Sequence, residues 1–266
     1  MRAILLLLLV PVVMWVSQTT LLIAAGLPVR MRIHAPELPR QFKQINRMVT
    51  YLAFLAVLTI YPLWCGASPL SYYASWFPYA DGRARELAWG MAAATLFLSL
   101  LYVAWIGSGN VTFRVRHERR RLIKRLIGVP ITAIMVALLE ELLFRAVLMA
   151  DLLQTFHRHH IIAVLLGAII FAGAHYVRSV KRYWTIGGHV TLGVLLCLSF
   201  LYTQALWLPI GLHAAGVILL LGTRPFIRYE GPTWLIGASV FPYAGAVGVI
   251  ALAMLTVNVY LTYGGR

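Results

Sequence analysis

The chain has 266 residues, of which 61% are hydrophobic and only 12% are charged, and its mean hydropathy is +0.81. Soluble domains hold about 45–50% apolar residues, and a fold of this length keeps too much surface to bury such an excess. The composition therefore excludes a soluble globular protein. Lys and Arg number 23 against 8 Asp and Glu. Because these basic residues punctuate apolar segments, we assign them to membrane-flanking loops and expect no nucleic-acid partner.

A membrane-spanning helix needs about 20 apolar residues, and eight segments of the chain approach that length. We therefore predict an all-α polytopic membrane protein with about eight transmembrane helices. Their expected bounds are 3–25, 49–67, 87–106, 127–149, 161–177, 190–206, 208–221 and 235–260.

The first segment is longer than the ~7–15 residue apolar core of a cleaved signal peptide. Basic residues follow this segment instead of preceding it, so we expect a retained helix with its N-terminus outside. The inner loops are then 26–48, 107–126, 178–189 and 222–234, and with counts of 5, 7, 3 and 2 they hold 17 of the 23 Lys and Arg residues. This asymmetry follows the positive-inside rule. We expect an integral protein of the bacterial inner (cytoplasmic) membrane, with the lipid bilayer as a partner.

The fourth predicted span contains two adjacent carboxylates, Glu140 and Glu141, followed by Arg145. Each charge at this depth costs about 2.5–3.5 kcal/mol even on lenient insertion scales. Glu141 and Arg145 are four residues apart, so they share a helix face and can pair. Glu140 points about 100° away and is left to face a cavity, where a carboxylate suits a general base. A purely structural ion pair explains Glu141 and Arg145 well but leaves Glu140 unexplained.

Two histidines lie at membrane depth on other predicted spans. His175 ends the run Phe171-Ala172-Gly173-Ala174-His175, and His213 lies in Gly211-Leu212-His213-Ala214-Ala215. The small residues around both allow neighbouring helices to approach closely. One such histidine is usually a hydrogen-bonded core residue, but two of them beside a Glu-Glu pair favour a shared site.

These motifs, in this order, resemble the CAAX-protease and bacteriocin-processing family of intramembrane glutamic endopeptidases. The resemblance covers residues 127–222, and it divides the chain into N-terminal helices with a basic loop (1–126), a protease-like core (127–222) and a C-terminal helix (223–266). It implies a peptide or protein substrate at the membrane, hydrolysed by water without a cofactor or metal.

The resemblance also implies a role for each matching residue. Glu140 would activate the attacking water with the help of His175, and His213 would stabilise the oxyanion. Glu141 and Arg145 would position Glu140 and hold the site together. One position departs from the family pattern: where the family often has Asn, four residues after the last His, this chain has Val217, which has no hydrogen-bond donor. Loss of an oxyanion donor costs about 10²–10³ in turnover.

Three alternatives stay open. Val217 favours a non-catalytic scaffold, chaperone or immunity-type relative. The trio Glu140, His175 and His213 could instead bind a metal in a hydrolase, or form the proton relay of a transporter. The run of His157, His159 and His160 could also bind a metal, although a polar interfacial loop explains it more simply.

Overall fold

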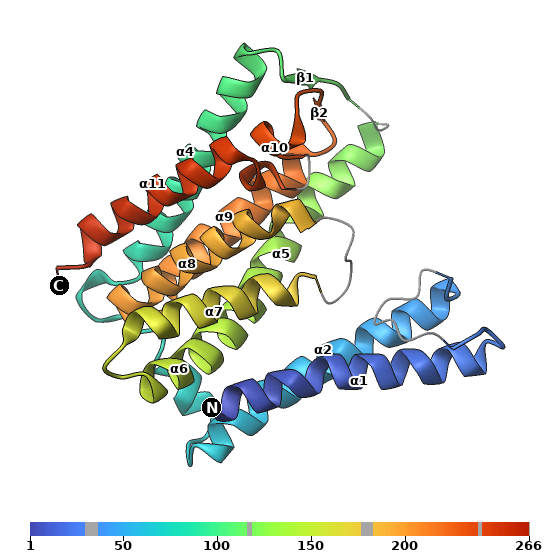
Figure 1. Cartoon of the computed structure of the whole chain (residues 1–266), viewed down its shortest axis with the longest axis vertical. Coiled ribbons are helices and arrows are strands. Elements are labelled where there is room, and N and C mark those ends of the chain that lie inside the picture. The colour runs from blue at the N-terminus through green and yellow to red at the C-terminus, as the bar shows by residue number, and fades with distance from the viewer. Residues whose placement is uncertain (30–36, 116–118, 177–182, 239–240, 266) are drawn as a thin grey trace.

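Helices dominate the computed structural model, which describes residues 1–29, 37–115, 119–176, 183–238 and 241–265 (Figure 1). The prediction of an all-α polytopic fold is confirmed. The longer helices are α1 (Arg2–Ala24), α2 (Arg40–Trp64), α4 (Arg85–Gly107), α5 (Arg119–Glu141), α7 (His160–Ala174), α8 (Ile186–Thr203), α9 (Trp207–Thr223) and α11 (Ala246–Tyr263). The shorter helical elements are α3 (Pro69–Ala74), η1 (Ala80–Gly82), the π-helix η2 (Leu142–Met149), α6 (Ala150–Thr155), η3 (Tyr183–Thr185), α10 (Thr233–Ile236) and η4 (Pro242–Ala244).

Within the described residues, six helices are long and apolar enough to cross a membrane, and α7 and α9 are two shorter apolar helices. One of the six is a continuous helical segment of 34 residues, Leu122–Thr155, which joins α5, η2 and α6. Together these helices match the eight predicted segments. A small antiparallel sheet, not predicted, pairs β1 (Val111–Phe113) with β2 (Ile227–Tyr229).

Several predicted boundaries are wrong. The helices α2 and α5 begin at Arg40 and Arg119, inside segments expected to be inner loops. The fourth span continues to Thr155, beyond the expected end at 149. The helix α8 begins at Ile186, inside the segment expected to be an inner loop. The last span is interrupted, because Gly237 adopts a positive φ of 76° and the chain does not resume a long helix until Ala246. The predicted inner loop 178–189 also includes Arg178, Lys181 and Arg182, which lie outside the described residues.

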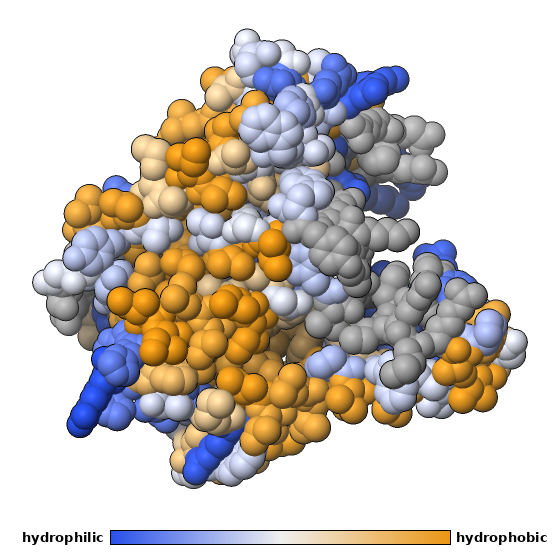
Figure 2. Space-filling view, viewed as in Figure 1, coloured by the Kyte–Doolittle hydropathy of each residue, from blue (hydrophilic) through white to orange (hydrophobic). Residues whose placement is uncertain are grey.

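The surface has the character expected of a lipid-facing protein. Leu5, Leu8 and Leu9 on α1 and Ile127 and Ile131 on α5 are all more than half exposed. Soluble monomers rarely expose apolar patches of such extent. Figure 2 shows that apolar side chains cover broad areas of the visible face and that hydrophilic residues gather toward its edges. Lipid is therefore the solvent that suits these helices.

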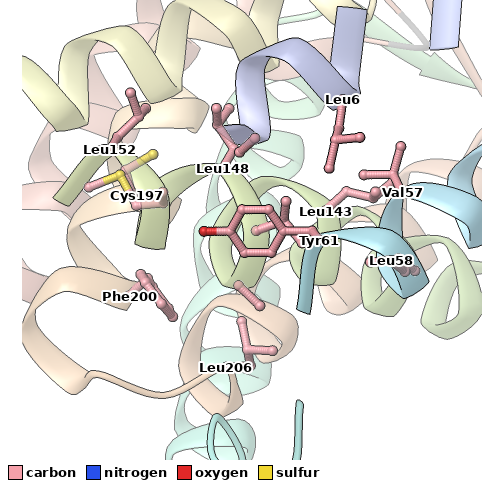
Figure 3. Close-up of a cluster of buried hydrophobic side chains, with 14 of the residues drawn as sticks. Leu6, Val57, Leu58, Tyr61, Leu143, Leu148, Leu152, Cys197, Phe200 and Leu206 are labelled. Carbon is pink, nitrogen blue, oxygen red and sulfur yellow. The ribbon is translucent and has the colours of Figure 1, made fainter. Parts of the chain in front are cut away.

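The helices α1 and α2 form a hairpin beside the other helices (Figure 1). The hairpin is attached through a buried apolar cluster in which Leu6, Val57 and Tyr61 pack with Leu143 and Leu148 of η2 (Figure 3). Tyr61 is only 1% exposed, although it is the largest hairpin side chain in the cluster. This contact anchors the hairpin to the segment that follows the two glutamates.

Glycines bring the central helices close together. A Cβ added to Gly90 of α4 would lie 2.7 Å from the Leu208 carbonyl oxygen of α9, and one on Gly211 of α9 would collide with the Leu87 carbonyl oxygen of α4. A Cβ on Gly193 of α8 would lie 2.9 Å from Ala168 Cα of α7. Small residues that allow such backbone approach are typical of helix contacts in membranes. They fix the positions of α7 and α9, which carry His175 and His213.

Candidate active site

The end of α5 presents its two carboxylates to different surroundings. Glu141 and Arg145 are each 0% exposed, and Arg145 Nε lies 3.1 Å from Glu141 Oε2. Arg145 also donates from Nη1 to Glu141 Oε1 at 3.2 Å, and its guanidinium lies 4.6 Å from the centre of the Phe171 ring. The four-residue spacing predicted this pair. A buried charge needs such a partner, because burial of an uncompensated charge costs several kcal/mol.

Glu141 has a second partner, which the sequence spacing could not reveal. His213 Nδ1 lies 2.7 Å from Glu141 Oε1, across 72 residues of sequence. A carboxylate paired with Arg145 is ionised and can only accept hydrogen bonds. The Nδ1–H of the His213 imidazole is therefore the donor. The Nε2 atom of His213 is thereby directed away from Glu141 and toward Glu140.

Glu140 lies between the two histidines. Its Oε2 atom is 3.8 Å from His175 Nε2 and 3.7 Å from His213 Nε2. Both distances exceed a direct hydrogen bond, and this buried oxygen has no hydrogen-bond partner among the described residues. Glu140 is thus close to both imidazoles without a direct hydrogen bond to either.

The tautomer of His175 follows from its other contact. His175 Nδ1 lies 2.9 Å from the Phe171 carbonyl oxygen. A carbonyl only accepts, so Nδ1 carries the hydrogen and donates. In the neutral ring, Nε2 therefore presents a lone pair toward Glu140.

A cavity of about 230 Å³ joins these groups. Its polar lining consists of Glu140, His175, His213 and Tyr243, and the rest of its described lining is apolar and includes Val217. A few polar groups converging in an apolar cavity is the usual form of a ligand or active site. In the part of the chain that the structure describes, no three His, Cys, Asp or Glu side chains are arranged to hold a metal ion.

The structure thus brings all five predicted residues together, even though helix lengths counted from the sequence place the three side chains nearest the cavity at different depths. The extension of the fourth span to Thr155 explains why Glu140 lies as deep as His175. Glu140 lies 15 residues before the end of this span, and His175 lies 15 residues after the start of α7 at His160.

His213 reaches the same depth because α9 begins inside the protein. Leu206 and Leu208 are 0% exposed at its start. The Leu206 amide donates to the Trp76 carbonyl oxygen, and the Trp207 indole donates to the Pro78 carbonyl oxygen. The segment 76–78 therefore covers the beginning of α9, which does not start at the surface as the sequence count assumed.

Sequence reasoning missed two polar residues near the site. His189 is 1% exposed, and its ring centre lies 4.9 Å from that of His175. It was counted as part of an inner loop, and only its position directly after Gly187-Gly188 hints at close helix packing. Tyr243 lines the cavity from η4. No sequence signal separates this tyrosine from the interfacial aromatic residues.

Part of the chain matches a known protein family. Residues 122–219 match the family model of type II CAAX prenyl endopeptidases, described as Rce1-like. No curated protein and no solved structure matches the chain. The matched segment is somewhat over a third of the chain and contains Glu140, Glu141, Arg145, His175 and His213. The resemblance stated from the sequence is confirmed over this segment, which is similar to Rce1-like type II CAAX prenyl endopeptidases.

Proposed function

We propose that this protein is an intramembrane endopeptidase that hydrolyses a peptide bond with a water molecule activated by Glu140 and His175. The observation that carries the proposal is the position of Glu140 Oε2, which lies at the cavity within 3.8 Å of imidazole nitrogens from α9 and from the end of α7. Titratable groups that converge in an apolar cavity are a recurrent feature of active sites.

The donor and acceptor pattern favours water at this point. Glu140, when ionised, only accepts hydrogen bonds, and the Nε2 atom of neutral His175 also only accepts. A water molecule between them donates one O–H bond to each group. Its oxygen lone pair is then free to attack a carbonyl carbon placed in the cavity.

In the proposed reaction, the water oxygen forms a bond to the carbonyl carbon as one of its protons passes to Glu140. The carbonyl π electrons move to the oxygen and create an oxyanion. The tetrahedral intermediate then breaks its C–N bond, and Glu140 returns the proton to the leaving nitrogen. The products are a carboxylic acid, which ionises in water, and an amine. General acid–base catalysis of this kind contributes about 10²–10⁴ in rate.

We assign His213 to the oxyanion. Glu140, Glu141 and Arg145 together carry one excess negative charge, which protonation of His213 balances. Nδ1–H of His213 donates to Glu141 at 2.7 Å, so Nε2–H faces the cavity. When Glu140 takes the water proton, the negative charge moves to the oxyanion and the cluster stays neutral. Fixed donors directed at developing charge are often the largest catalytic contribution.

The proposed substrate is a peptide or protein segment held at the membrane, and the family description makes a prenylated CAAX tail the first probe. We also propose that the protein resides in a bacterial inner membrane with its N-terminus outside, that residues 127–222 form the catalytic core, and that the reaction uses no cofactor or metal.

The test compares wild-type protein with Glu140→Gln in lipid vesicles. Cleavage of a quenched fluorescent peptide ending in a farnesylated Cys-aliphatic-aliphatic-Met sequence is measured with and without EDTA. In parallel, peptide termini are mapped in the membranes of cells that express either form. We expect cleavage by the wild-type protein only, unaffected by EDTA. Equal cleavage by both forms, or no difference in either assay, would refute the protease.

The alternative is a non-catalytic scaffold, which Val217 favours because this side chain adds no donor to the cavity lining. A scaffold predicts that Glu140→Gln leaves both assays and any cellular phenotype unchanged. Inhibition by EDTA would instead indicate a metal-dependent hydrolase. Solute transport by the vesicles without peptide cleavage would indicate a transporter.

A further inference from the structure

The cavity is rich in hydrogen-bond acceptors and poor in donors. Glu140 accepts, and the Nδ1–H of His175 is committed to the Phe171 carbonyl oxygen. His213 has one N–H left for the cavity, since its other N–H donates to Glu141. A tetrahedral oxyanion accepts more than one hydrogen bond, so a second donor is needed. Among the described side chains that line the cavity, Tyr243 carries the remaining O–H group.

Tyr243 is held firmly in place. It is 8% exposed and lies in η4, between α8 and α11. A Cβ on Gly248 of α11 would lie 2.6 Å from Tyr243 Cα, and one on Gly188 of α8 would lie 3.1 Å from the Tyr243 carbonyl oxygen. The tyrosine backbone is therefore packed against the backbones of two helices. Precise placement of this kind is what a catalytic donor requires.

His189 fixes the direction of the tyrosine hydroxyl. His189 Nδ1 lies 2.9 Å from the Thr185 carbonyl oxygen, so Nδ1 carries the hydrogen and Nε2 accepts. Tyr243 Oη lies 3.3 Å from that Nε2 atom and donates to it. This bond is long for an O–H donor. A charged oxygen is a stronger acceptor than a neutral imidazole, so the hydroxyl hydrogen can turn from His189 to an oxyanion.

We propose that Tyr243 is a catalytic residue that donates its hydroxyl hydrogen bond to the oxyanion alongside His213, and that His189 is the positioning residue that holds this hydroxyl at the cavity. The proposal rests on the proposed protease function and adds to it a group outside the segment that matches the family model. No proton is transferred by Tyr243. Its hydroxyl changes acceptor as negative charge forms on the substrate oxygen.

The first test is kinetic and uses Tyr243→Phe, which removes one oxygen atom, in the vesicle assay with the farnesylated peptide. Loss of an oxyanion donor lowers turnover by about 10²–10³, so we expect kcat to fall by about 10² while KM changes less than about twofold. The matched control is Tyr176→Phe. The Tyr176 hydroxyl contacts Thr185 and His189 in the same network but is not part of the cavity lining, so its kcat should stay near wild type.

Rescue separates a chemical role from a structural one. Val217 lines the same cavity one helical turn after His213, so Val217→Asn places an amide donor there. We expect Val217→Asn to recover a large part of the kcat lost in Tyr243→Phe. If Tyr243→Phe only disturbed packing, the new amide would recover nothing, and that result would overturn the proposal.

A binding measurement makes the test independent of turnover. A phosphinate analogue of the same peptide places a tetrahedral, negatively charged group at the scissile position. We expect Tyr243→Phe to weaken its binding about ten- to a hundredfold, as loss of a hydrogen bond to a charged group does, while the unmodified peptide binds both forms equally. Unchanged phosphinate binding, or none by the wild-type protein, contradicts the role of Tyr243. Equal cleavage by wild type and Glu140→Gln contradicts the protease itself.

Discussion

The two sides of the helix that carries Glu140 and Glu141 differ sharply in their surroundings. On one side, Glu141 is fully buried and contacts Arg145 and His213. On the other, the Glu140 side chain is 26% exposed and borders the cavity. Two adjacent, chemically identical side chains thus have different partners. The Glu141 carboxylate pairs with Arg145 and His213, whereas Glu140 Oε2 is near two imidazoles and has no hydrogen-bond partner among the described residues. In the proposed reaction, Glu140 is the carboxylate that takes up a proton.

The largest expected effect is on the cavity side. Glu140→Gln keeps the shape of the side chain but removes the base, so turnover of the farnesylated peptide should fall by about 10²–10⁴. Thermal unfolding in detergent should show little loss of stability, because the replacement keeps the size of the side chain and the buried Oε2 atom has no hydrogen bond to lose. A variant that unfolds easily would show that Glu140 also supports the fold, and the contrast with Glu141 would then be lost.

On the buried side of the helix, a single substitution should lower the stability of the fold. Arg145→Met leaves the Glu141 charge buried with His213 as its remaining partner, and we expect a loss of about 3 kcal/mol in the free energy of unfolding. The double variant Glu141→Leu/Arg145→Leu removes both charges and should recover much of that stability. It should remain inactive, because His213 has lost its acceptor. An active double variant would argue against any role of Glu141 in orienting His213.

A change in the spacing between α4 and α9 should have a smaller effect on stability. Gly211→Ala forces α9 away from the Leu87 carbonyl oxygen of α4, and overpacking of this kind costs about 1–3 kcal/mol. Turnover should also fall, because His213 lies two residues further along α9. Gly222→Ala on the same helix is the matched control, since its added Cβ meets nothing within 4 Å. Equal stability of the two variants would show that the α4–α9 contact adapts.

The smallest effect is expected outside the cavity. His157, His159 and His160 are exposed, so replacing them together by Ala should change stability by less than about 0.5 kcal/mol per site. Peptide cleavage should also be unchanged. A clear loss of cleavage would assign this histidine run a function and would weaken the distinction between imidazoles inside and outside the cavity.

Local spacing made part of this arrangement predictable. Apolar segment lengths gave the number of helices, and the four-residue interval gave the Glu141–Arg145 pair, because both depend on neighbours along one helix. The contact of His213 with Glu141 depends on where α9 begins, and the burial of Leu206 and Leu208 beneath the segment 76–78 is a tertiary feature. Hydropathy cannot distinguish a helix that starts at the membrane surface from one that starts inside the protein.

Errors at the boundaries also hid residues. The polar segment 178–189 was interpreted as a loop, yet α8 begins at Ile186 and buries His189. The final apolar segment was interpreted as one helix, yet Gly237 and Pro242 interrupt it and place Tyr243 in η4. The positions of both residues depend on contacts between elements distant in sequence.

The π-helix η2 follows the glutamates directly and contains Arg145. A π-helical turn takes up one residue more than an α-helical turn, so deletion of a single residue between 142 and 149 would let this stretch relax into an α-helix. An α-helical turn takes up fewer residues, so the two changes largely offset each other, and the part of the chain beyond the deletion would nearly keep its rotation relative to Glu140 and Glu141. Loss of one residue in the α-helical part of α5 has no such compensation and would rotate the two glutamates by about 100° relative to the preceding part of that helix. A single-residue deletion should therefore be better tolerated within 142–149 than within α5.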